Sequence, residues 1–361
     1  MRIVVVGLGY VGLVTATCLA RLGHTVVGLE ADSRKLAALG TGRVPFFEPN
    51  LDADLATQLA AGRLTFTDRA DEALRIADAI LICVGTPSTS SGRADLGAVD
   101  SVVAQIADHL TRRTVVVLRS TVPVGTTRRL EAVLNEALAR RGGPGPVPVV
   151  ANPEFLRTGR AVDDFLRPSR VVLGRTALAT DADIDLLVAL YRPLEAPILV
   201  FDAESAELTK NAANAYLAMR ISFVNELAAL CEAAGASIDS VVRGLSLDPR
   251  IGGEYFRPGL GYGGSCLPKD VRSLVSMGAE RGVSMELARA IDRVNEHQPA
   301  RAAARLAGEF GGSLQDRRIG LLGLAFKPET DDVRDSPAIA LARELAAAGA
   351  SVAACDPKAT E

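Results

Sequence analysis

The stretch Ile3-Val4-Val5-Val6-Gly7-Leu8-Gly9-Tyr10-Val11-Gly12 decides the fold of the first part of this chain. Its β-branched start predicts a buried strand, and the apolar spacing over residues 11–21 predicts a helix. A second apolar run over residues 25–29 predicts another strand, which ends at Glu30. A strand, a Gly-x-Gly-x-x-Gly turn, a helix and an acidic residue after the next strand are the pattern of a doubly wound, dinucleotide-binding domain.

The three glycines of this turn have different roles in such a domain. Gly7 permits the tight bend, Gly9 lets the backbone approach a pyrophosphate, and Gly12 lets the helix and strand pack closely. The helix N-terminus, at Tyr10 and Val11, stabilises the phosphate charge. We therefore expect this turn to bind a dinucleotide; the alternative is a glycine turn in a sheet protein that binds no nucleotide.

Glu30 indicates which dinucleotide is bound. A carboxylate at this position accepts hydrogen bonds from ribose hydroxyls and repels a 2′-phosphate, so NAD is favoured over NADP. Lys35, one helical turn further along the chain, is a candidate contact on the adenosine side. NAD is therefore the cofactor that the sequence predicts.

Composition excludes several classes of function. The 361 residues carry 40 basic and 43 acidic side chains without a basic stripe, so nucleic acid is not an expected partner. No stretch approaches the roughly 20 apolar residues of a membrane helix. The 5 cysteines are scattered and form no Cys-x-x-Cys pair, which indicates neither a disulfide framework nor a zinc site. We expect a cytoplasmic protein with no metal and no membrane partner.

Further along the chain, strand and helix patterns alternate. Apolar runs at residues 79–84 and 114–118 are each followed by a helical pattern, at 99–110 and 127–141, which predicts a parallel sheet covered by helices. The Gly/Pro segment 142–146 is interpreted as a loop within this domain. The expected class is α/β, with an N-terminal Rossmann-like doubly wound domain over residues 1–201.

A long helix is expected next, because residues 202–234 contain neither Gly nor Pro. At about 1.5 Å per residue such a helix exceeds the thickness of one domain, so we expect it to join domains and to pack against a second copy in a homodimer. Residues 202–300 form the expected central helical domain for catalysis and dimerisation. A final strand, helix, strand pattern starts a second Rossmann-like domain, over 301–361, which is either a truncated domain or a module that packs on its neighbours.

The Gly-rich segment 259–266 ends in the most informative residue of the chain. Cys266 is followed closely by Lys269, a cation that favours the thiolate, and by Asp270, a carboxylate that could act as base. These neighbours predict a nucleophile. The alternative is a small buried thiol, the interpretation we give to Cys18, Cys83 and Cys231.

Other candidate residues are ambiguous individually. Lys210 and Asn214 share one face of the long helix, where they would be unremarkable if that face were in solvent. Residues 83–87 and 119–123 each contain a proline at a strand end, where doubly wound sheets bind ligands. Residues 152–156 and 326–327 follow two further strands.

In order and spacing, these segments resemble the UDP-glucose/GDP-mannose dehydrogenase family from residue 1 to about residue 356. The resemblance implies oxidation of the C6 alcohol of a sugar nucleotide to a carboxylate with two NAD. It also implies that Cys266 captures the aldehyde as a thiohemiacetal, which is oxidised to a thioester and hydrolysed.

The resemblance assigns a role to each of the other catalytic candidates. Lys210 and Asn214 stabilise the developing negative oxygen, and Asp270 accepts a proton through a water that Thr121 also holds. Glu154 assists thioester hydrolysis. These residues and Cys266 form the expected catalytic set.

The same resemblance assigns binding residues. Expected cofactor contacts are Gly7, Gly9, Tyr10, Val11, Gly12, Glu30, Lys35, Thr86, Thr121, Thr158, Lys269 and Arg334. Expected substrate contacts are Glu154, Phe155, Leu156, Arg157, Thr158, Lys210, Asn214, Tyr255, Phe256, Arg257, Pro258, Gly259, Gly263 and Lys327, together with Arg250, which reaches the site of the partner subunit. Thr158 departs from the family pattern, because many members carry a second Glu there.

Alternatives remain open for the substrate and for the class of function. The segment around Cys266 resembles the UDP-glucose branch, and Ser265 argues against the N-acetylhexosamine branch, which usually has His there; GDP-mannose or another nucleotide sugar stays an alternative. A competing enzyme is a one-step NAD-dependent alcohol or hydroxyacid dehydrogenase. A non-enzyme alternative is an NAD-binding sensor or scaffold.

Overall fold

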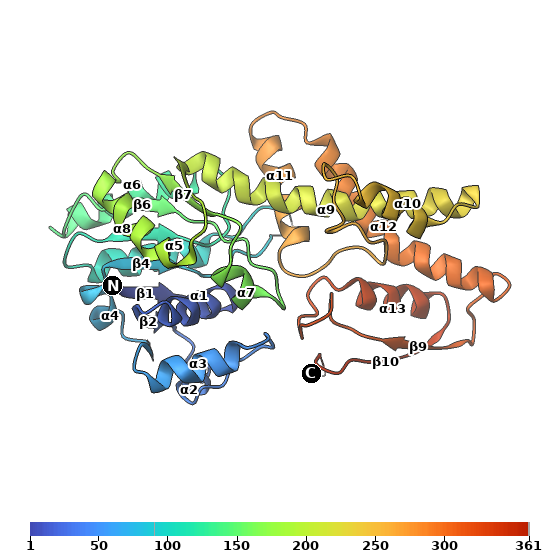
Figure 1. Ribbon diagram of the computed structural model, residues 1–361, viewed down its shortest axis with the longest axis horizontal. Helices are drawn as coiled ribbons and strands as arrows, with labels where there is room; N and C mark the ends of the chain where they lie inside the picture. Colours follow the sequence, from blue (N-terminus) through green and yellow to red (C-terminus); the bar gives the residue numbers. More distant parts are fainter. Residues whose placement is uncertain (90, 360–361) are drawn as a thin grey trace. The chain divides into compact units, whose positions relative to one another are not determined.

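The computed structural model describes residues 1–89 and 91–359 (Figure 1). The chain divides into two compact units. The first unit comprises Met1–Pro87 and Ala94–Lys210, and the second comprises Ser88–Arg93 and Asn211–Glu361. Helix α9 (Ala203–Ala234) begins in the first unit and continues into the second.

The first unit contains a sheet whose strand order, among the described residues, is β3-β2-β1-β4-β5-β6-β7-β8. The strands are β1 (Arg2–Val6), β2 (Thr25–Leu29), β3 (Leu64–Thr67), β4 (Ala79–Ile82), β5 (Val115–Leu118), β6 (Val149–Ala151), β7 (Val171–Arg175) and β8 (Ile198–Asp202). The order reverses between β1 and β4, so the expected doubly wound α/β fold is confirmed.

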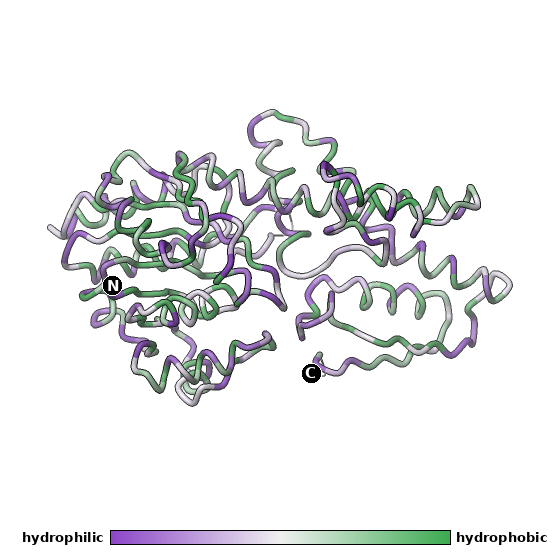
Figure 2. The backbone as a smooth tube through the Cα atoms, viewed as in Figure 1, coloured by the Kyte–Doolittle hydropathy of each residue, from purple (hydrophilic) through white to green (hydrophobic). Residues whose placement is uncertain are grey.

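Helices cover both faces of this sheet. They are α1 (Tyr10–Arg21), α2 (Ser33–Gly40), α3 (Leu51–Ala60), α4 (Ala70–Ile76), α5 (Gly97–His109), α6 (Thr126–Arg140), α7 (Ala161–Leu166) and α8 (Asp181–Tyr191), with a 3₁₀ turn, η1 (Arg192–Leu194). Ile3 and Val5 of β1 pack with α1, α3, α7 and α8, whereas Val4 and Val6 pack with α4, α5 and α6. Because both faces are buried, the central strands are apolar throughout, as the green tube in Figure 2 shows.

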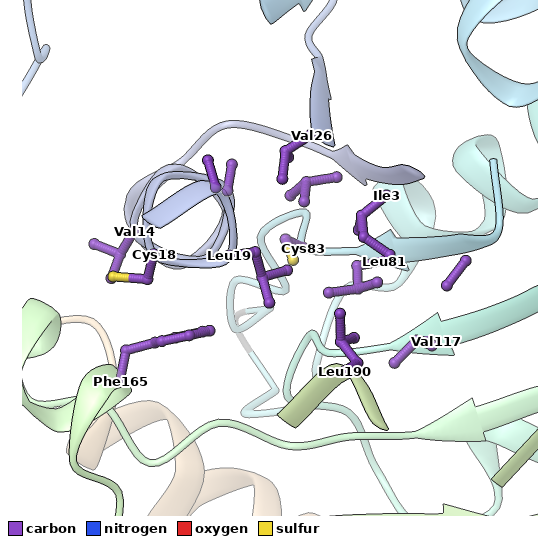
Figure 3. Close-up of a cluster of buried hydrophobic side chains, with 14 of the residues drawn as sticks. Ile3, Val14, Cys18, Leu19, Val26, Leu81, Cys83, Val117, Phe165 and Leu190 are labelled. Carbon is purple, nitrogen blue, oxygen red and sulfur yellow. The ribbon is translucent and has the colours of Figure 1, made fainter. Parts of the chain in front are cut away.

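Figure 3 shows part of the first of these two cores, in which Cys18 and Cys83 lie among Leu19, Leu81 and Phe165. Burial raises the pKa of each of these two thiols to about 12. Cys231 is also buried. The interpretation of these three cysteines as small buried thiols is therefore confirmed.

Strand β7 corrects the expectation of a parallel sheet, because it runs antiparallel to β6. The connection between them contains only the short helix α7, so the chain turns back at the carboxyl end of β6 instead of crossing over to the opposite edge. Strand β8 then pairs parallel to β7. This return keeps residues 152–160 at the carboxyl ends of the central strands.

The second unit contains the remainder of α9 with α10 (Ile238–Ser246), α11 (Leu267–Glu280) and α12 (Glu286–Glu309). The long helix, expected over residues 202–234 with Asp202 as its N-cap, begins at Ala203. The Asp202 carboxylate accepts a hydrogen bond from the Ser205 amide at 2.7 Å. The largely helical character expected for the middle of the chain is confirmed.

A strand, helix, strand module follows, made of β9 (Arg318–Leu322), α13 (Pro337–Ala347) and β10 (Ser351–Cys355). The two strands are parallel, as predicted. Leu345 of α13 packs with Ala303 of α12 and with Leu314, so the module shares a small core with the preceding helix. Within the described ranges, no helix is long and apolar enough to cross a membrane.

Gly174 of β7 tests the packing of the first unit. A Cβ at this position would lie 2.6 Å from the Ala206 Cβ and 2.8 Å from the Ala151 Cβ. We expect Gly174→Ala to lower the free energy of unfolding by about 1–3 kcal/mol, because α9 and β6 must each move away from β7. Thermal unfolding followed by calorimetry measures the change.

The matched control is Gly320→Ala in β9, where an added Cβ would meet no atom within 4 Å. We expect this variant to unfold within about 1 kcal/mol of the wild type. Equal destabilisation by the two substitutions would contradict the packing argument.

Candidate active site

The glycine turn between β1 and α1 is closely packed at Gly7 and Gly12 and open at Gly9. Gly7 has φ +87°, and an added Cβ would lie 2.6 Å from the Val84 Cγ1. At Gly12 the added Cβ would lie 1.8 Å from the Gly7 carbonyl oxygen, whereas at Gly9 it would meet no atom within 4 Å. Gly9 therefore leaves an open backbone at a helix N-terminus, which fits the pyrophosphate of a dinucleotide.

Glu30 is attached to this turn. One of its carboxylate oxygens accepts hydrogen bonds from the Leu8 amide at 3.0 Å and from the Lys35 ammonium at 2.8 Å. Burial alone would raise the pKa of Glu30, but the hydrogen bonds from Lys35 and from backbone amides outweigh it and lower this pKa below the usual value. The resulting negative charge suits the ribose of NAD and disfavours a 2′-phosphate.

Glu48 is a site residue that the sequence analysis missed. The Tyr10 hydroxyl donates to its carboxylate, which also accepts the amides of Gly159 at 2.6 Å and Ala161 at 2.7 Å. Burial, above all, raises the pKa of both Tyr10 and Glu48. Thr158 also hydrogen-bonds to Tyr10. Glu48 thereby holds the loop after β6 against the start of α1, and no local motif around it could have predicted this.

The two proline-containing loops meet at the carboxyl ends of β4 and β5. The Thr86 hydroxyl donates to the Thr121 carbonyl at 2.7 Å, and the Ser120 hydroxyl donates to the Val84 carbonyl at 2.6 Å. These contacts bring the two candidates Thr86 and Thr121 together at the sheet edge where such folds bind ligands.

Glu154 and Lys210 form a buried ion pair in the first unit. Their side chains are 5% and 3% exposed, and Nζ lies 3.1 Å from Oε1. Burial favours the neutral carboxyl, but the Lys210 charge, the Leu156 amide and the Arg119 charge outweigh it and lower the pKa of Glu154. The Phe155 ring lies beneath the Arg170 guanidinium, at 3.8 Å, and 5.6 Å from the Lys210 ammonium. The alternative in which Lys210 faces solvent is therefore excluded.

Asn214 is buried in the second unit and contacts another predicted residue. Its amide donates to the Asp270 carboxylate at 2.6 Å, and Lys269 donates to the other oxygen of the same carboxylate. Asp270 itself is fully buried on the first turn of α11. The cation expected to act on Cys266, Lys269, is thus ion-paired with Asp270.

Cys266 immediately precedes α11 and is partly exposed. Its carbonyl accepts the Asp270 amide at 2.9 Å, and its Sγ lies 3.7 Å from the Ser265 hydroxyl. The hydrogen bond to Asp332 is the main cause of the raised pKa of Arg334, and the charge of Cys266 also contributes. Arg334 therefore lies close enough to the sulfur for an electrostatic interaction.

The glycines before Cys266 admit neighbouring protein atoms. A Cβ at Gly263 would lie 2.2 Å from the Asp335 carbonyl, and one at Gly264, which has φ +80°, would lie 2.7 Å from the Phe326 ring. The Gly264 amide donates to the Arg334 carbonyl at 2.8 Å. Close packing is therefore one reason for glycine at these two positions.

The remaining candidates occupy varied surroundings. Arg157 forms an ion pair with Asp164 at 2.7 Å, and the exposed Arg250 forms one with Asp248 at 2.6 Å. Phe256 is buried, with its ring centroid 5.2 Å from the Arg220 guanidinium. Tyr255, Arg257, Pro258 and Gly259 flank Phe256, and the Lys327 ammonium lies 5.8 Å from the Phe326 ring. Val11 is on the first turn of α1.

Models of known families match nearly the whole chain. The NAD binding domain of the UDP-glucose/GDP-mannose dehydrogenase family matches residues 1–195, its central domain residues 204–297 and its UDP binding domain residues 320–361. The chain belongs to this family. The predicted cofactor, NAD, is therefore confirmed along with the resemblance.

Individual relatives support the same family assignment. The chain is 43% identical over 365 residues to a UDP-glucose 6-dehydrogenase of Rhizobium meliloti (strain 1021), covering 100% of this chain and 82% of the relative. A solved UDP-glucose dehydrogenase from Pyrobaculum islandicum has a TM-score of 0.92 at 41% identity, covering 99% and 82%. A GDP-mannose dehydrogenase from Pseudomonas aeruginosa has a TM-score of 0.66 at 35% identity, covering 99% of this chain and 81% of that one.

The buried ion pair of Glu154 and Lys210 should make the stability of the fold depend on pH. Glu154→Gln leaves Lys210 buried without its carboxylate, and we expect a loss of about 3–5 kcal/mol of stability at neutral pH. Because the pKa of Glu154 is lowered, this stabilisation is complete above the ordinary carboxyl pKa of about 4.3 and is lost as the pH falls through the lowered value. The unfolding midpoints of wild type and variant should therefore converge on acidification.

Glu136→Gln is the control, because Glu136 is an exposed glutamate of α6. Its effect should stay within about 1 kcal/mol at every pH. A gap between wild type and Glu154→Gln that is independent of pH would show that the charge of Glu154 does not stabilise the fold.

Proposed function

We propose that the chain catalyses the NAD-dependent, four-electron oxidation of the C6 alcohol of UDP-glucose to a carboxylate, giving UDP-glucuronate. The observation that carries this proposal is the partly exposed thiol of Cys266 at the start of α11, beside the buried Asp270 and its partner Asn214. The relatives named UDP-glucose 6-dehydrogenase, at 43% identity over the whole chain, support the same reaction.

The turn at Gly9, Tyr10 and Val11, together with Glu30, would hold the cofactor. When bound, NAD accepts one hydride from C6 in each of the two oxidations. Thr86 and Thr121 lie at the strand ends of the same unit. Lys35, Thr158, Lys269 and Arg334 complete the proposed cofactor contacts.

In the first oxidation the chain must remove a proton and stabilise a negative oxygen. We assign the proton to Asp270 and the stabilisation of the oxygen to Lys210 and Asn214. Both of these residues are buried and hydrogen-bonded, so each presents its polar group in a fixed orientation. The product of this step is an aldehyde at C6.

Cys266 then captures that aldehyde. A bond forms between Sγ and C6, and the thiol proton passes to the aldehyde oxygen, which gives a thiohemiacetal. Loss of the second hydride and of the hydroxyl proton leaves a thioester. Water, assisted by Glu154, attacks its carbonyl carbon; the C–S bond breaks, the acid is released and the thiol is restored. The start of a helix and the nearby Arg334 both favour negative charge on the sulfur.

For substrate binding we propose the loop residues Phe155, Leu156, Arg157, Tyr255, Phe256, Arg257, Pro258, Gly259, Gly263 and Lys327. The proposed domains are 1–201 for NAD, 202–300 for catalysis and dimerisation, and 301–361 for the UDP-sugar. The match of residues 320–361 to a UDP binding domain supports the last of these. GDP-mannose is the second candidate substrate, and the lower similarity to a GDP-mannose dehydrogenase, at 35% identity, makes it the less favoured one.

We also propose a cytoplasmic homodimer that assembles through α9, with Arg250 reaching the partner's site. Tyr216, Phe223 and Leu230 follow one another at intervals of seven residues and are 55%, 49% and 64% exposed. Such spacing forms an apolar stripe along one side of a helix, as in helices that pack against a second copy. The five cysteines, all within the described ranges, form no disulfide, which suits a reducing compartment.

The stripe is tested by Leu230→Glu. Two charges introduced across a twofold-related helix contact should raise the dimer dissociation constant at least about tenfold, measured by sedimentation. Leu287→Glu is the matched control, because Leu287 of α12 is also 64% exposed. A wild-type chain that sediments as a monomer would refute the proposal.

Cys266→Ser tests the proposed reaction. The wild type should form two NADH per UDP-glucose consumed, counted by absorbance, and GDP-mannose should react more slowly. We expect the variant to lose acid formation by on the order of a thousandfold, because a serine hydroxyl is a far weaker nucleophile than a thiolate. Cys355→Ser, at an exposed thiol of β10, should be unaffected.

Other outcomes would decide between the alternatives. One NADH per sugar in the wild type would indicate a one-step dehydrogenase. NAD binding without NADH formation from either sugar nucleotide would indicate a sensor or scaffold. Unchanged acid formation by Cys266→Ser would refute the thiol mechanism.

A further inference from the structure

Asn295 of α12 makes two hydrogen bonds to the main chain of the thiol loop, the Gly-rich segment of residues 259–266 that ends in Cys266. Its Oδ1 accepts a hydrogen bond from the Tyr262 amide at 2.7 Å, and its Nδ2 donates to the Tyr262 carbonyl at 2.9 Å. One side chain thus satisfies both main-chain groups of a single residue, as a neighbouring strand would. Tyr262 lies four positions before Cys266.

Tyr262 is also fixed through its side chain. The side chain is buried with Ala215 of α9, Val271 of α11 and Ile291 of α12. Its main chain and its ring are therefore both held by the helices of the second unit. Tyr262 is an anchor from which the following glycines lead to the thiol.

Gly261 makes the approach of Asn295 possible. It has φ +103°, and an added Cβ would lie 2.4 Å from the Asn295 Oδ1. Two residues earlier, the Gly259 amide donates to the Oδ1 of Asn225, a buried residue of α9, at 2.8 Å. At Gly261 the absence of a side chain thus leaves room for Asn295, whereas at Gly259 an added Cβ would meet no atom within 4 Å.

Gly263 and Gly264 have no side chains, so between Tyr262 and Cys266 the loop is held by its main chain, including the hydrogen bond from the Gly264 amide to the Arg334 carbonyl at 2.8 Å. We propose that Asn295 is a positioning residue that fixes the sulfur of Cys266 by clamping Tyr262. This inference rests on the proposed nucleophilic role of Cys266. Attack on a carbon is sensitive to small displacements of the nucleophile, so loosening this anchor slows the reaction without removing any reacting group.

Asn295→Asp tests the clamp with little change in shape. The acceptor for the Tyr262 amide remains, but an oxygen replaces the donor that faces the Tyr262 carbonyl. We expect kcat to fall about tenfold while the KM for NAD stays within twofold. In the protein without nucleotide or sugar, alkylation of Cys266 by iodoacetamide, located by peptide mapping, should become at least about threefold faster, because a looser loop exposes the sulfur more often.

Ser222→Ala is the matched control. The buried Ser222 of α9 donates to the Ile291 carbonyl of α12 at 2.9 Å. The substitution therefore removes a hydrogen bond to the helix that carries Asn295, but not one to the loop. This variant should lower the unfolding temperature while kcat and the alkylation rate stay within twofold of wild type. Asn295→Ser, which removes the clamp without adding a charge, provides the same readouts if the Asp variant folds poorly.

Unchanged alkylation and kcat in Asn295→Asp would overturn the inference, and so would equal changes in Asn295→Asp and Ser222→Ala. The proposed function fails by a different result, namely acid formation by Cys266→Ser. The alkylation rate is measured without turnover, so it reports on the position of the loop in either case.

Discussion

Close approach of backbone segments, which only glycine permits, is the constraint on which both functional loops depend. At Gly12 an added Cβ would lie 1.8 Å from the Gly7 carbonyl, so any side chain there would separate α1 from the turn that precedes it. At Gly263 it would lie 2.2 Å from the Asp335 carbonyl oxygen. In the first unit this closeness leaves Gly9 open for a phosphate; in the second it presses the thiol loop against its neighbours.

Buried polar pairs supply the chemistry around these loops. Lys210 is neutralised by Glu154, and Asp270 is held by Asn214 and Lys269, so each charged group has a partner in its own unit. A buried charge without a partner would destabilise the fold, whereas a buried charge with a partner is compensated and stays in a fixed orientation. Helix α9 carries one member of each pair, which is why a single long helix matters to the proposed catalysis.

Sequence reasoning succeeded where the signal is local. The β-branched runs, the glycine turn and the long helix without Gly or Pro predicted their elements to within a few residues. Burial produces characteristic apolar patterns in the sequence, and tight turns require glycine at particular positions. It failed where partners are distant in the chain. Glu48 contacts Gly159, and Asn295 contacts Tyr262, but neither residue lies in a motif. The burial of Lys210 likewise depends on a carboxylate 56 positions away.

The central claim is that the sugar is bound covalently to the sulfur of Cys266, first as a thiohemiacetal and then as a thioester. Acid quenching during turnover of UDP-glucose with NAD, followed by peptide mass mapping, tests this most directly. The account predicts that the peptide containing Cys266 carries the mass of a thioester-linked UDP-glucuronyl group, and that the peptide containing Cys355 does not. An unmodified Cys266 peptide during rapid formation of two NADH per sugar would contradict it.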